Sequence, residues 1–283
     1  MTAQPEQGQH DAGAWSTREA VETWRRGTAS RADALGPVTE RMLDLAGVAA
    51  GGRVLDVAAG TGDQTLLAAR RVGPTGSILA TDLSPTMLEA AADAAREAGF
   101  TNVETRVMDA QDLQVDPDSF DAAISRFGLM LMPLPQQALA GIRRALEPGG
   151  KLAAIVFSGA DKNPHQALPV LIARRHRGLP AQTPGEAGMF ALGGDGVLED
   201  ALRAAGFREV AVHPFTITRR AASAVEAVTR LKDSLLIVRE LLAPLDAAER
   251  EAVWAEIERE LRRFEGPDGF AVSGEALIGV GTK

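Results

Sequence analysis

The chain has 283 residues, a formal net charge of -8 and 45% hydrophobic residues, which predicts an ordinary globular protein of one extended domain or two small ones. It contains no cysteine and no tyrosine, which excludes disulfides, thiolate metal sites, cysteine nucleophiles and phenolic general acids. The excess of acidic residues disfavours a nucleic-acid partner, because proteins that bind nucleic acids present a basic face.

The first 50 residues are expected to form a tail followed by helices. Residues 1–13 are polar and lack a hydrophobic signal core, so we predict a disordered tail. Residues 14–50 are predicted as a helical cap, with Ser16 and Glu19 at capping-box spacing and a second helix after Pro37. Since no apolar run approaches the roughly 20 residues of a membrane span, we expect a cytoplasmic protein without one.

Residues 51–215 alternate between strand-like and helix-like segments. Apolar runs predict strands at Arg53–Ala58, Ser77–Thr81, Val103–Met108, Phe120–Ser125 and Lys151–Phe157. Helical spacing predicts helices at Leu66–Val72, Pro85–Ala98 and Pro135–Leu146. This alternation predicts an α/β fold with a doubly wound, mostly parallel sheet, which binds ligands at the carboxyl ends of its strands.

The C-terminal part is expected to complete the sheet around a helical insertion. We predict a helix at Leu198–Ala205 and strands at Arg208–His213 and Ala276–Val280, which bring the sheet to seven strands. Residues 216–267 keep helical spacing, with one stretch that ends at Pro244 and another capped by Asp246 and Glu249. Residues 268–283 are then the closing strand, and the insertion is a candidate lid.

Glycines and acidic residues gather where the predicted strands end. After the first strand the chain turns through Gly60 and Gly62 into a helix, so a ligand can approach bare backbone and helix N–H groups. Asp56, Asp82 and Asp109 are 26 and 27 residues apart, one strand–helix unit each. The three acidic residues therefore line the same edge of the sheet.

Asp82 and Asp109 have the chemistry of a nucleoside site. Ser84 suits a helix N-cap and Pro85 the first helical turn, so we expect the Asp82 carboxylate to be free for a ligand. A carboxylate in this place can accept both hydroxyls of a ribose. Asp109 next to Ala110 pairs an acceptor with a small residue, as the edge of an adenine needs.

These motifs carry a resemblance to a known family. The segments are Val54–Gly62, Asp82, Asp109–Ala110, Phe120–Gly128 and Leu146–Gly150. In this order and spacing the chain resembles the class I S-adenosylmethionine (SAM)-dependent methyltransferases, especially the small-molecule branch around the ubiquinone/menaquinone C-methyltransferases. The resemblance implies a Rossmann-like fold, SAM as cofactor with S-adenosylhomocysteine as product, no metal, and a small-molecule acceptor methylated on oxygen or carbon rather than nitrogen.

The resemblance also implies roles for single residues. Gly60 and Gly62 would lie beneath the methionine part of SAM, Asp56 would order the loop, and Asp82 would bind the ribose. The remaining implied cofactor-binding residues are Ala58, Thr61, Leu83, Met87, Asp109, Ala110, Ser125 and Arg126, the last two facing the reaction centre. Ala58 stands where the family has a glycine, so its φ must be negative or its backbone strained.

Two alternatives stay open. The spacing of Gly60, Gly62 and Asp82 also mimics an NAD(P)-dependent oxidoreductase, although Thr65 stands at the third glycine position. The chain can also be a SAM-binding protein without turnover.

Methyl transfer chiefly needs orientation and exclusion of water, and it needs a base only when the acceptor must lose a proton. His165, which follows the strand ending at Phe157, is the candidate base, and Arg126 is suited to anchor an anionic oxygen. Candidates for the acceptor pocket are Trp15, Trp24, Phe127, Met130, Met132, Met189 and Phe190. The apolar insertion indicates a sizeable apolar acceptor or a homodimer contact.

Overall fold

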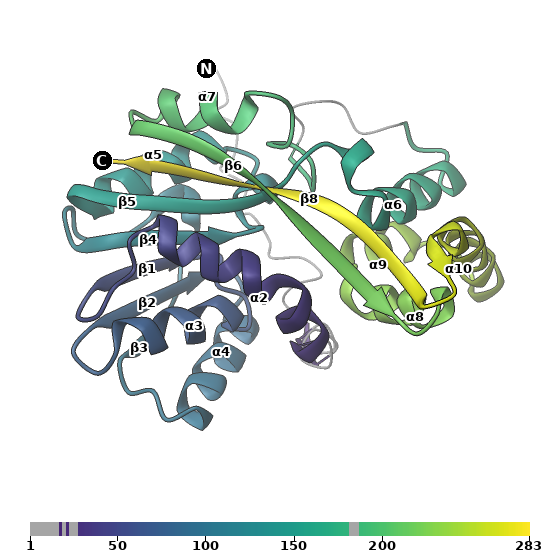
Figure 1. Ribbon diagram of the computed structural model, residues 1–283, viewed down its shortest axis with the longest axis horizontal. Helices are drawn as coiled ribbons and strands as arrows, with labels where there is room; N and C mark the ends of the chain where they lie inside the picture. The colour runs from purple at the N-terminus through teal and green to yellow at the C-terminus, as the bar shows by residue number, and fades with distance from the viewer. Residues whose placement is uncertain (1–16, 19–20, 23–27, 181–186) are drawn as a thin grey trace, which may run out of the picture.

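A single mixed sheet forms the centre of the computed structural model, which describes residues 17–18, 21–22, 28–180 and 187–283 (Figure 1). Its strands are β1 (Arg53–Val57), β2 (Ser77–Asp82), β3 (Val103–Val107), β4 (Phe120–Arg126), β5 (Leu146–Phe157), β6 (Arg208–Ala221), β7 (Glu265–Gly266) and β8 (Gly269–Thr282). The order is β3-β2-β1-β4-β5-β8-β6, with the short β7 paired to β8. The first five strands are parallel and β8 is antiparallel to both neighbours, which confirms the doubly wound α/β prediction.

Helices cover both faces of this sheet. They are α2 (Thr28–Leu45), α3 (Asp63–Val72), α4 (Pro85–Glu97), α5 (Pro135–Ala145), α6 (Pro164–His176), α7 (Val197–Ala204), α8 (Ala224–Ser234), α9 (Leu236–Leu242) and α10 (Ala247–Leu261). Successive residues of a strand point to opposite faces, so Val54 packs in the cluster that includes α2 and α3, whereas Leu55 packs in the cluster that includes α5 and α7. The sheet therefore has a core on each side.

β6 and β8 extend well beyond the rest of the sheet. β5 ends at Phe157, opposite Ala276, but the β6–β8 pair continues to Ala221 opposite Phe270. We call this extension the arm (residues 216–221 and 270–275), and it leads to α8, α9 and α10 (Figure 1). The predicted strand end at His213 was wrong, because β6 is an edge strand and tolerates Pro214. Residues 216–221 of the predicted helical insertion are therefore strand, and β8 begins at Gly269 rather than Ala276, within the predicted closing segment 268–283.

Some helix predictions also need correction. α2 begins at Thr28 and runs through Pro37 rather than starting after it. The helical stretch before Pro244 is two helices that meet at Leu235. The capping box of Asp246 and Glu249 at the start of α10 is confirmed.

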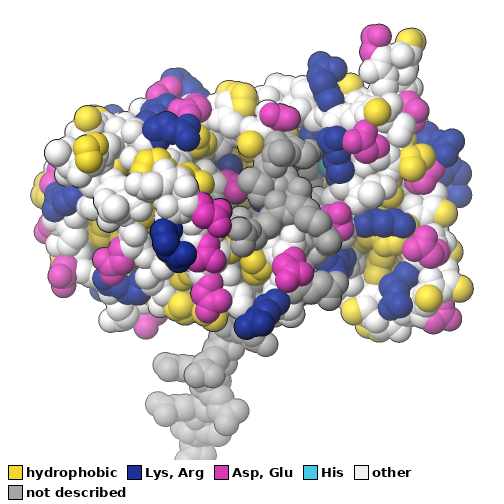
Figure 2. Space-filling model, turned by 90° about the horizontal axis from the view of Figure 1, so that it is seen from below, with side chains coloured by type: hydrophobic (Ala, Val, Ile, Leu, Met, Phe, Trp, Pro, Cys, Tyr) yellow, Lys and Arg dark blue, Asp and Glu magenta, His cyan; other side chains and the backbone are white. Residues whose placement is uncertain are grey.

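Several predictions lie outside the described residues, namely those for the tail 1–13, the Ser16–Glu19 capping box, Trp15 and Trp24. Within the described part of the chain, no helix is long and apolar enough to cross a membrane. On the face shown in Figure 2, the described Lys and Arg side chains are interspersed with Asp and Glu.

Candidate functional site

The loop between β1 and α3 holds two glycines with different surroundings. Gly60 and Gly62 both have positive φ, 58° and 85°. A Cβ on Gly62 would lie 3.0 Å from the Cβ of Ala91, so Gly62 lets the loop pack on α4. A Cβ on Gly60 would have no atom of the described residues within 4 Å. Gly60 therefore presents bare backbone to open space.

The backbone of Ala58 is strained, as the sequence allowed. Its φ is 58°, in the left-handed region that costs an alanine about 1–2 kcal/mol. Phe127, just after β4, has a φ of 60°. A Cβ on the adjoining Gly128 would lie 2.5 Å from the Cβ of Ala58, so the two loops come into close contact. Strained residues of this kind gather at functional sites.

Asp56 is fully buried and holds the loop from below. Its carboxylate accepts hydrogen bonds from Gln64 Nε2 at 3.1 Å and from Thr65 Oγ1 at 2.6 Å. Burial raises the pKa of Asp56 to about 6. Asp56 therefore ties β1 to the first turn of α3, in keeping with its expected role in ordering the loop.

Asp82 ends β2 beside the same loop, but its carboxylate is not free. Oδ2 accepts the N–H of Gly60 and Oδ1 the N–H of Ser84, each at 2.9 Å. The N–H of Leu83 also donates to this carboxylate. Since an ionised carboxylate has about four acceptor positions, the Asp82 carboxylate keeps capacity for a ligand hydroxyl. Burial raises the pKa of Asp82. The expected N-cap is confirmed, because Ser84 Oγ accepts the N–H of Met87.

The predicted adenine and methionine neighbours lie at the next loops. Asp109 caps the short helix η2 (Ala110–Asp112) by accepting the N–H of Gln111 at 2.8 Å, and Ala110 is half-buried. Leu83 is half-buried beside Asp82, whereas Met87 is buried in a small hydrophobic cluster with Val21. The structure thus brings the three strand-end aspartates to one edge of the sheet.

Two buried hydroxyls close to this edge lack a protein partner. Thr61 Oγ1 and Ser125 Oγ are inaccessible to water and make no hydrogen bond within the described chain. An unsatisfied buried hydroxyl costs about 1–3 kcal/mol, so each such atom needs a partner such as a bound water, an ion or a ligand. With the open side of Gly60 and the remaining acceptor capacity of Asp82, these residues fit a polar cofactor such as SAM.

Arg126 is occupied by contacts with two helices. Its guanidinium donates to Thr39 Oγ1 on α2 at 2.9 Å and lies 3.4 Å from Asp63 Oδ2 on α3. Asp63 also pairs with Arg31 at 3.1 Å. Arg126 therefore ties the end of β4 to α2 and α3, a role that its sequence position did not reveal. Its role toward the acceptor stays a prediction.

His165 lies in the first turn of α6 and is 8% exposed. Burial, together with the positive charge of Arg219, keeps the pKa of His165 well below its usual value, so the imidazole is neutral at physiological pH. The guanidinium of Arg219 lies 5.9 Å from the centre of the Phe157 ring. Arg219 belongs to the arm. It was not identified from the sequence as a candidate site residue, because the predicted strand stopped at His213.

The predicted acceptor-pocket residues divide into two groups. Phe127 stacks on Phe157 with ring centres 4.3 Å apart, and Phe190 lies 6.3 Å from Phe157. Met130 and Met132 instead line a hollow of about 320 Å³ beside α5 and α7. The aromatic group adjoins Arg219 through Phe157.

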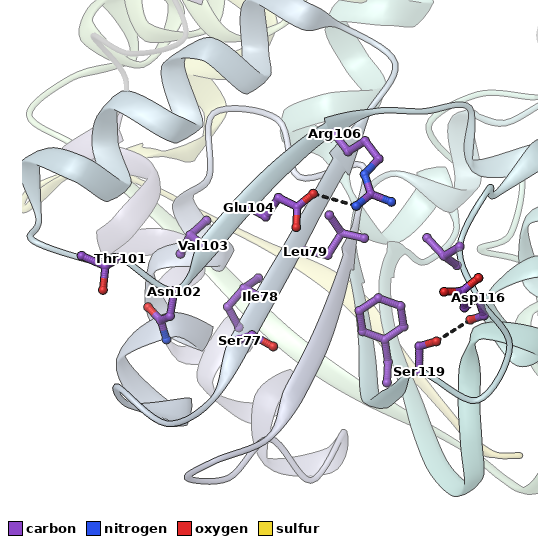
Figure 3. A pocket seen from close by; sticks show the side chains of 12 residues that line it. Ser77, Ile78, Leu79, Thr101, Asn102, Val103, Glu104, Arg106, Asp116 and Ser119 are labelled. Atoms are coloured by element: carbon purple, nitrogen blue, oxygen red, sulfur yellow. Dashed lines mark hydrogen bonds and ion pairs between the residues drawn. The ribbon is translucent and has the colours of Figure 1, made fainter.

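A further hollow, of about 410 Å³, opens at the edge of the sheet away from the glycine loop (Figure 3). Ile78, Val103 and Phe120 line it, and the Glu104–Arg106 ion pair at 2.6 Å crosses its upper part. None of the predicted cofactor-binding residues borders this hollow. Among the described residues, no group of three or more His, Asp or Glu side chains is placed to hold a metal ion.

Comparison with known proteins agrees with the motifs. Residues 54–150 match the family described as "Methyltransferase domain". The ubiquinone/menaquinone biosynthesis C-methyltransferase UbiE of Pseudomonas fluorescens is 39% identical over 117 residues, 41% of this chain and 46% of that protein. The chain thus aligns with about half the length of this curated relative.

Solved structures share the fold at low sequence identity. A putative methyltransferase from Bacillus halodurans superposes with a TM-score of 0.58 at 17% identity, covering 87% of this chain and 98% of that one. Haemonchus contortus phosphoethanolamine N-methyltransferase 2, solved with SAM, gives 0.57 at 19% identity over 91% and 57% of the two chains. By motif order, matched domain and fold, the chain resembles the class I SAM-dependent methyltransferases, with UbiE among its relatives.

Proposed function

We propose that this protein transfers a methyl group from SAM to an oxygen or carbon atom of a small-molecule acceptor. The observation that carries the proposal is the pair of unpartnered buried hydroxyls, that of Thr61 next to Gly60 and that of Ser125 near the contact of Gly128 with Ala58. The methyltransferase-domain match over residues 54–150 and the UbiE relatives support it.

The residues of the glycine loop and the strand ends would hold the cofactor. Asp82 keeps acceptor capacity for the ribose hydroxyls, and Asp109 with Ala110 offers an edge for the adenine. Asp56 holds the loop that carries Gly60 without itself reaching the ligand. When bound, SAM supplies a methyl group already activated by a sulfonium charge, so the protein need not generate an electrophile.

The acceptor would lie on the far side of Phe127 and Phe157, between the core (51–215) and the helices of the insertion (216–267). Apolar side chains there exclude water, which favours a transition state in which the sulfonium charge is cancelled. The neutral imidazole of His165 can accept a proton where the acceptor must lose one. The insertion thus serves as a lid in this proposal. Its alternative role is an apolar contact with a second copy of the chain in a homodimer.

The experiment is a transfer assay with methyl-labelled SAM and a panel of phenols, hydroquinones and polycyclic natural products. Transfer of label to oxygen or carbon of a panel member, with S-adenosylhomocysteine released in equal amount, would support the proposal. Tight SAM binding with no transfer to any member would favour a binding protein without turnover. Binding of NADH in place of SAM would favour an oxidoreductase.

A further inference from the structure

A buried positive charge lies on the acceptor side of the molecule. Arg219 is half-buried in the arm, and no carboxylate among the described residues pairs with it. The Gln166 amide oxygen, when turned toward the guanidinium, accepts hydrogen bonds from it at 2.8 to 3.2 Å. Burial lowers the pKa of Arg219 to about 10, so the group stays charged at neutral pH.

Two other buried arginines of the described residues have an acidic partner. Arg31 and Arg126 share the carboxylate of Asp63 at 3.1 and 3.4 Å. Removing a guanidinium from water without a counter-charge is costly. The neighbours Gln166 and His165 are neutral, so neither offsets the positive charge of Arg219. No carboxylate of the described residues therefore balances the positive charge of Arg219.

The position of Arg219 connects it with the proposed reaction centre. Its guanidinium lies over the ring of Phe157, which stacks on Phe127 directly after β4. Ser125, with its unpartnered hydroxyl, lies two residues before Phe127. Phe127, Phe157 and Arg219 thus lie in a row, with an aromatic ring at one end and the guanidinium at the other.

We propose that Arg219 binds a carboxylate of the methyl acceptor, with the aromatic part of the acceptor beside the half-buried ring of Phe127. A guanidinium has the planar, forked donors that match a carboxylate. Aromatic rings favour a flat unsaturated neighbour. The substrate class is then an aromatic carboxylic acid, and this inference rests on the proposed methyltransferase function only for what happens to that acid.

The test uses calorimetry on the full-length protein, with and without S-adenosylhomocysteine. The probes are benzoate and 1-hydroxy-2-naphthoate, each against its neutral amide. At least one acid should bind about tenfold or more tighter than its amide, the effect of a charge-assisted hydrogen bond. Arg219→Gln should abolish this preference and Arg219→Lys, which keeps the charge, should retain part of it.

Arg220→Gln is the matched control, because Arg220 is the exposed neighbour on the same strand and its loss removes the same charge. This control should leave the preference for the acid unchanged. Thermal unfolding of each variant shows whether it is folded. If Arg219→Gln does not fold, Arg219→Met, which keeps the length of the side chain without its charge, takes its place and should likewise abolish the preference.

Three results would overturn the inference. They are equal binding of acids and amides, no binding of either, and a preference for the acid that survives in a folded Arg219 variant without the charge. Failure of S-adenosylhomocysteine to bind would instead count against the proposed function. The acid-over-amide preference measured without the nucleoside still decides the role of Arg219, so the two failures are distinguishable.

Discussion

The proposed cofactor-binding edge of this molecule, the cofactor side, and the proposed acceptor region, the acceptor side, are built differently. The cofactor side consists of short loops after neighbouring parallel strands, within the matched residues 54–150. The acceptor side brings together His165 on α6, Arg219 on the arm and the ring of Phe157, all outside that segment. In the proposed function, one fold thus keeps a nucleoside site near the parallel strands while a separate part of the chain selects the acceptor.

Electrostatics differ between the two sides as well. The cofactor side offers carboxylates and unpartnered hydroxyls, which suit a ligand rich in hydrogen-bond donors and acceptors. The acceptor side offers a guanidinium without a carboxylate and a neutral imidazole. The following five predictions test whether the two sides are separable.

The two loop glycines should respond differently to alanine. Gly62→Ala should lower the free energy of unfolding by about 2–4 kcal/mol, because left-handed strain adds to a clash with Ala91. Gly60→Ala should cost only the strain, about 1–2 kcal/mol, but should weaken SAM. Urea denaturation and calorimetry measure the two effects. Equal stability losses, or unchanged SAM affinity in Gly60→Ala, would contradict this division.

The burial of Asp56 should make stability depend on pH. Its folded pKa of about 6 exceeds the ordinary value of 3.8, so its contribution is greatest below pH 4 and is lost as pH rises through 6. The wild type should lose on the order of 3 kcal/mol over this interval relative to Asp56→Asn, which cannot ionise. Urea titrations of both proteins from pH 4 to pH 7 measure the difference. Parallel pH profiles would show that Asp56 does not titrate there.

His165→Ala should separate turnover from cofactor binding. Loss of a general base lowers kcat by about 100-fold or more, whereas SAM affinity should stay unchanged because His165 contacts the arm rather than the loop. Steady-state rates across pH, with calorimetry beside them, test this. Wild-type turnover and an unaltered pH profile would remove His165 from the proton-transfer role.

Asp82→Ala should weaken SAM by about 1.5–3 kcal/mol, the range for hydrogen bonds to a charged group. The N–H groups of Gly60 and Ser84 also lose their acceptor, so part of the effect is loop disorder. Asp116→Ala, in a loop remote from the glycine loop, is the control. Wild-type SAM affinity in the Asp82 variant would refute its role at the ribose.

Ala58→Gly should give the smallest effect, a gain of about 0.5–1 kcal/mol in unfolding free energy. Relief of left-handed strain outweighs the greater freedom of glycine in the unfolded chain. Denaturant midpoints measure the gain. A loss of stability would mean that the contact of Ala58 with Gly128 matters more than its backbone strain.

The sequence predicted the cofactor side because its signals are local. Strand periodicity, a glycine turn and an aspartate at each strand end are readable within a few residues, and the structure places Asp56, Asp82 and Asp109 at one edge. What the sequence could not show is that the Asp82 carboxylate already accepts the backbone N–H groups of Gly60, Leu83 and Ser84. Such bonds depend on how the loop folds back on β2.

The acceptor side was harder to predict because its contacts join distant segments. The predicted strand stopped at His213, and this hid the arm and with it Arg219. Extending the strand would have placed Phe215, Ile217 and Arg219 on one face, where a charged residue in line with buried ones is a signal. The break between α8 and α9 at Leu235 had no comparable signal, since apolar spacing continues through it.

The central claim is that the edge formed by the glycine loop and the strand-end aspartates binds SAM. Calorimetric titration of the full-length protein with SAM, S-adenosylhomocysteine and NADH tests it most directly. We predict micromolar binding of the first two and none of NADH. Tight binding of NADH, or no binding of either SAM or S-adenosylhomocysteine, would contradict the claim.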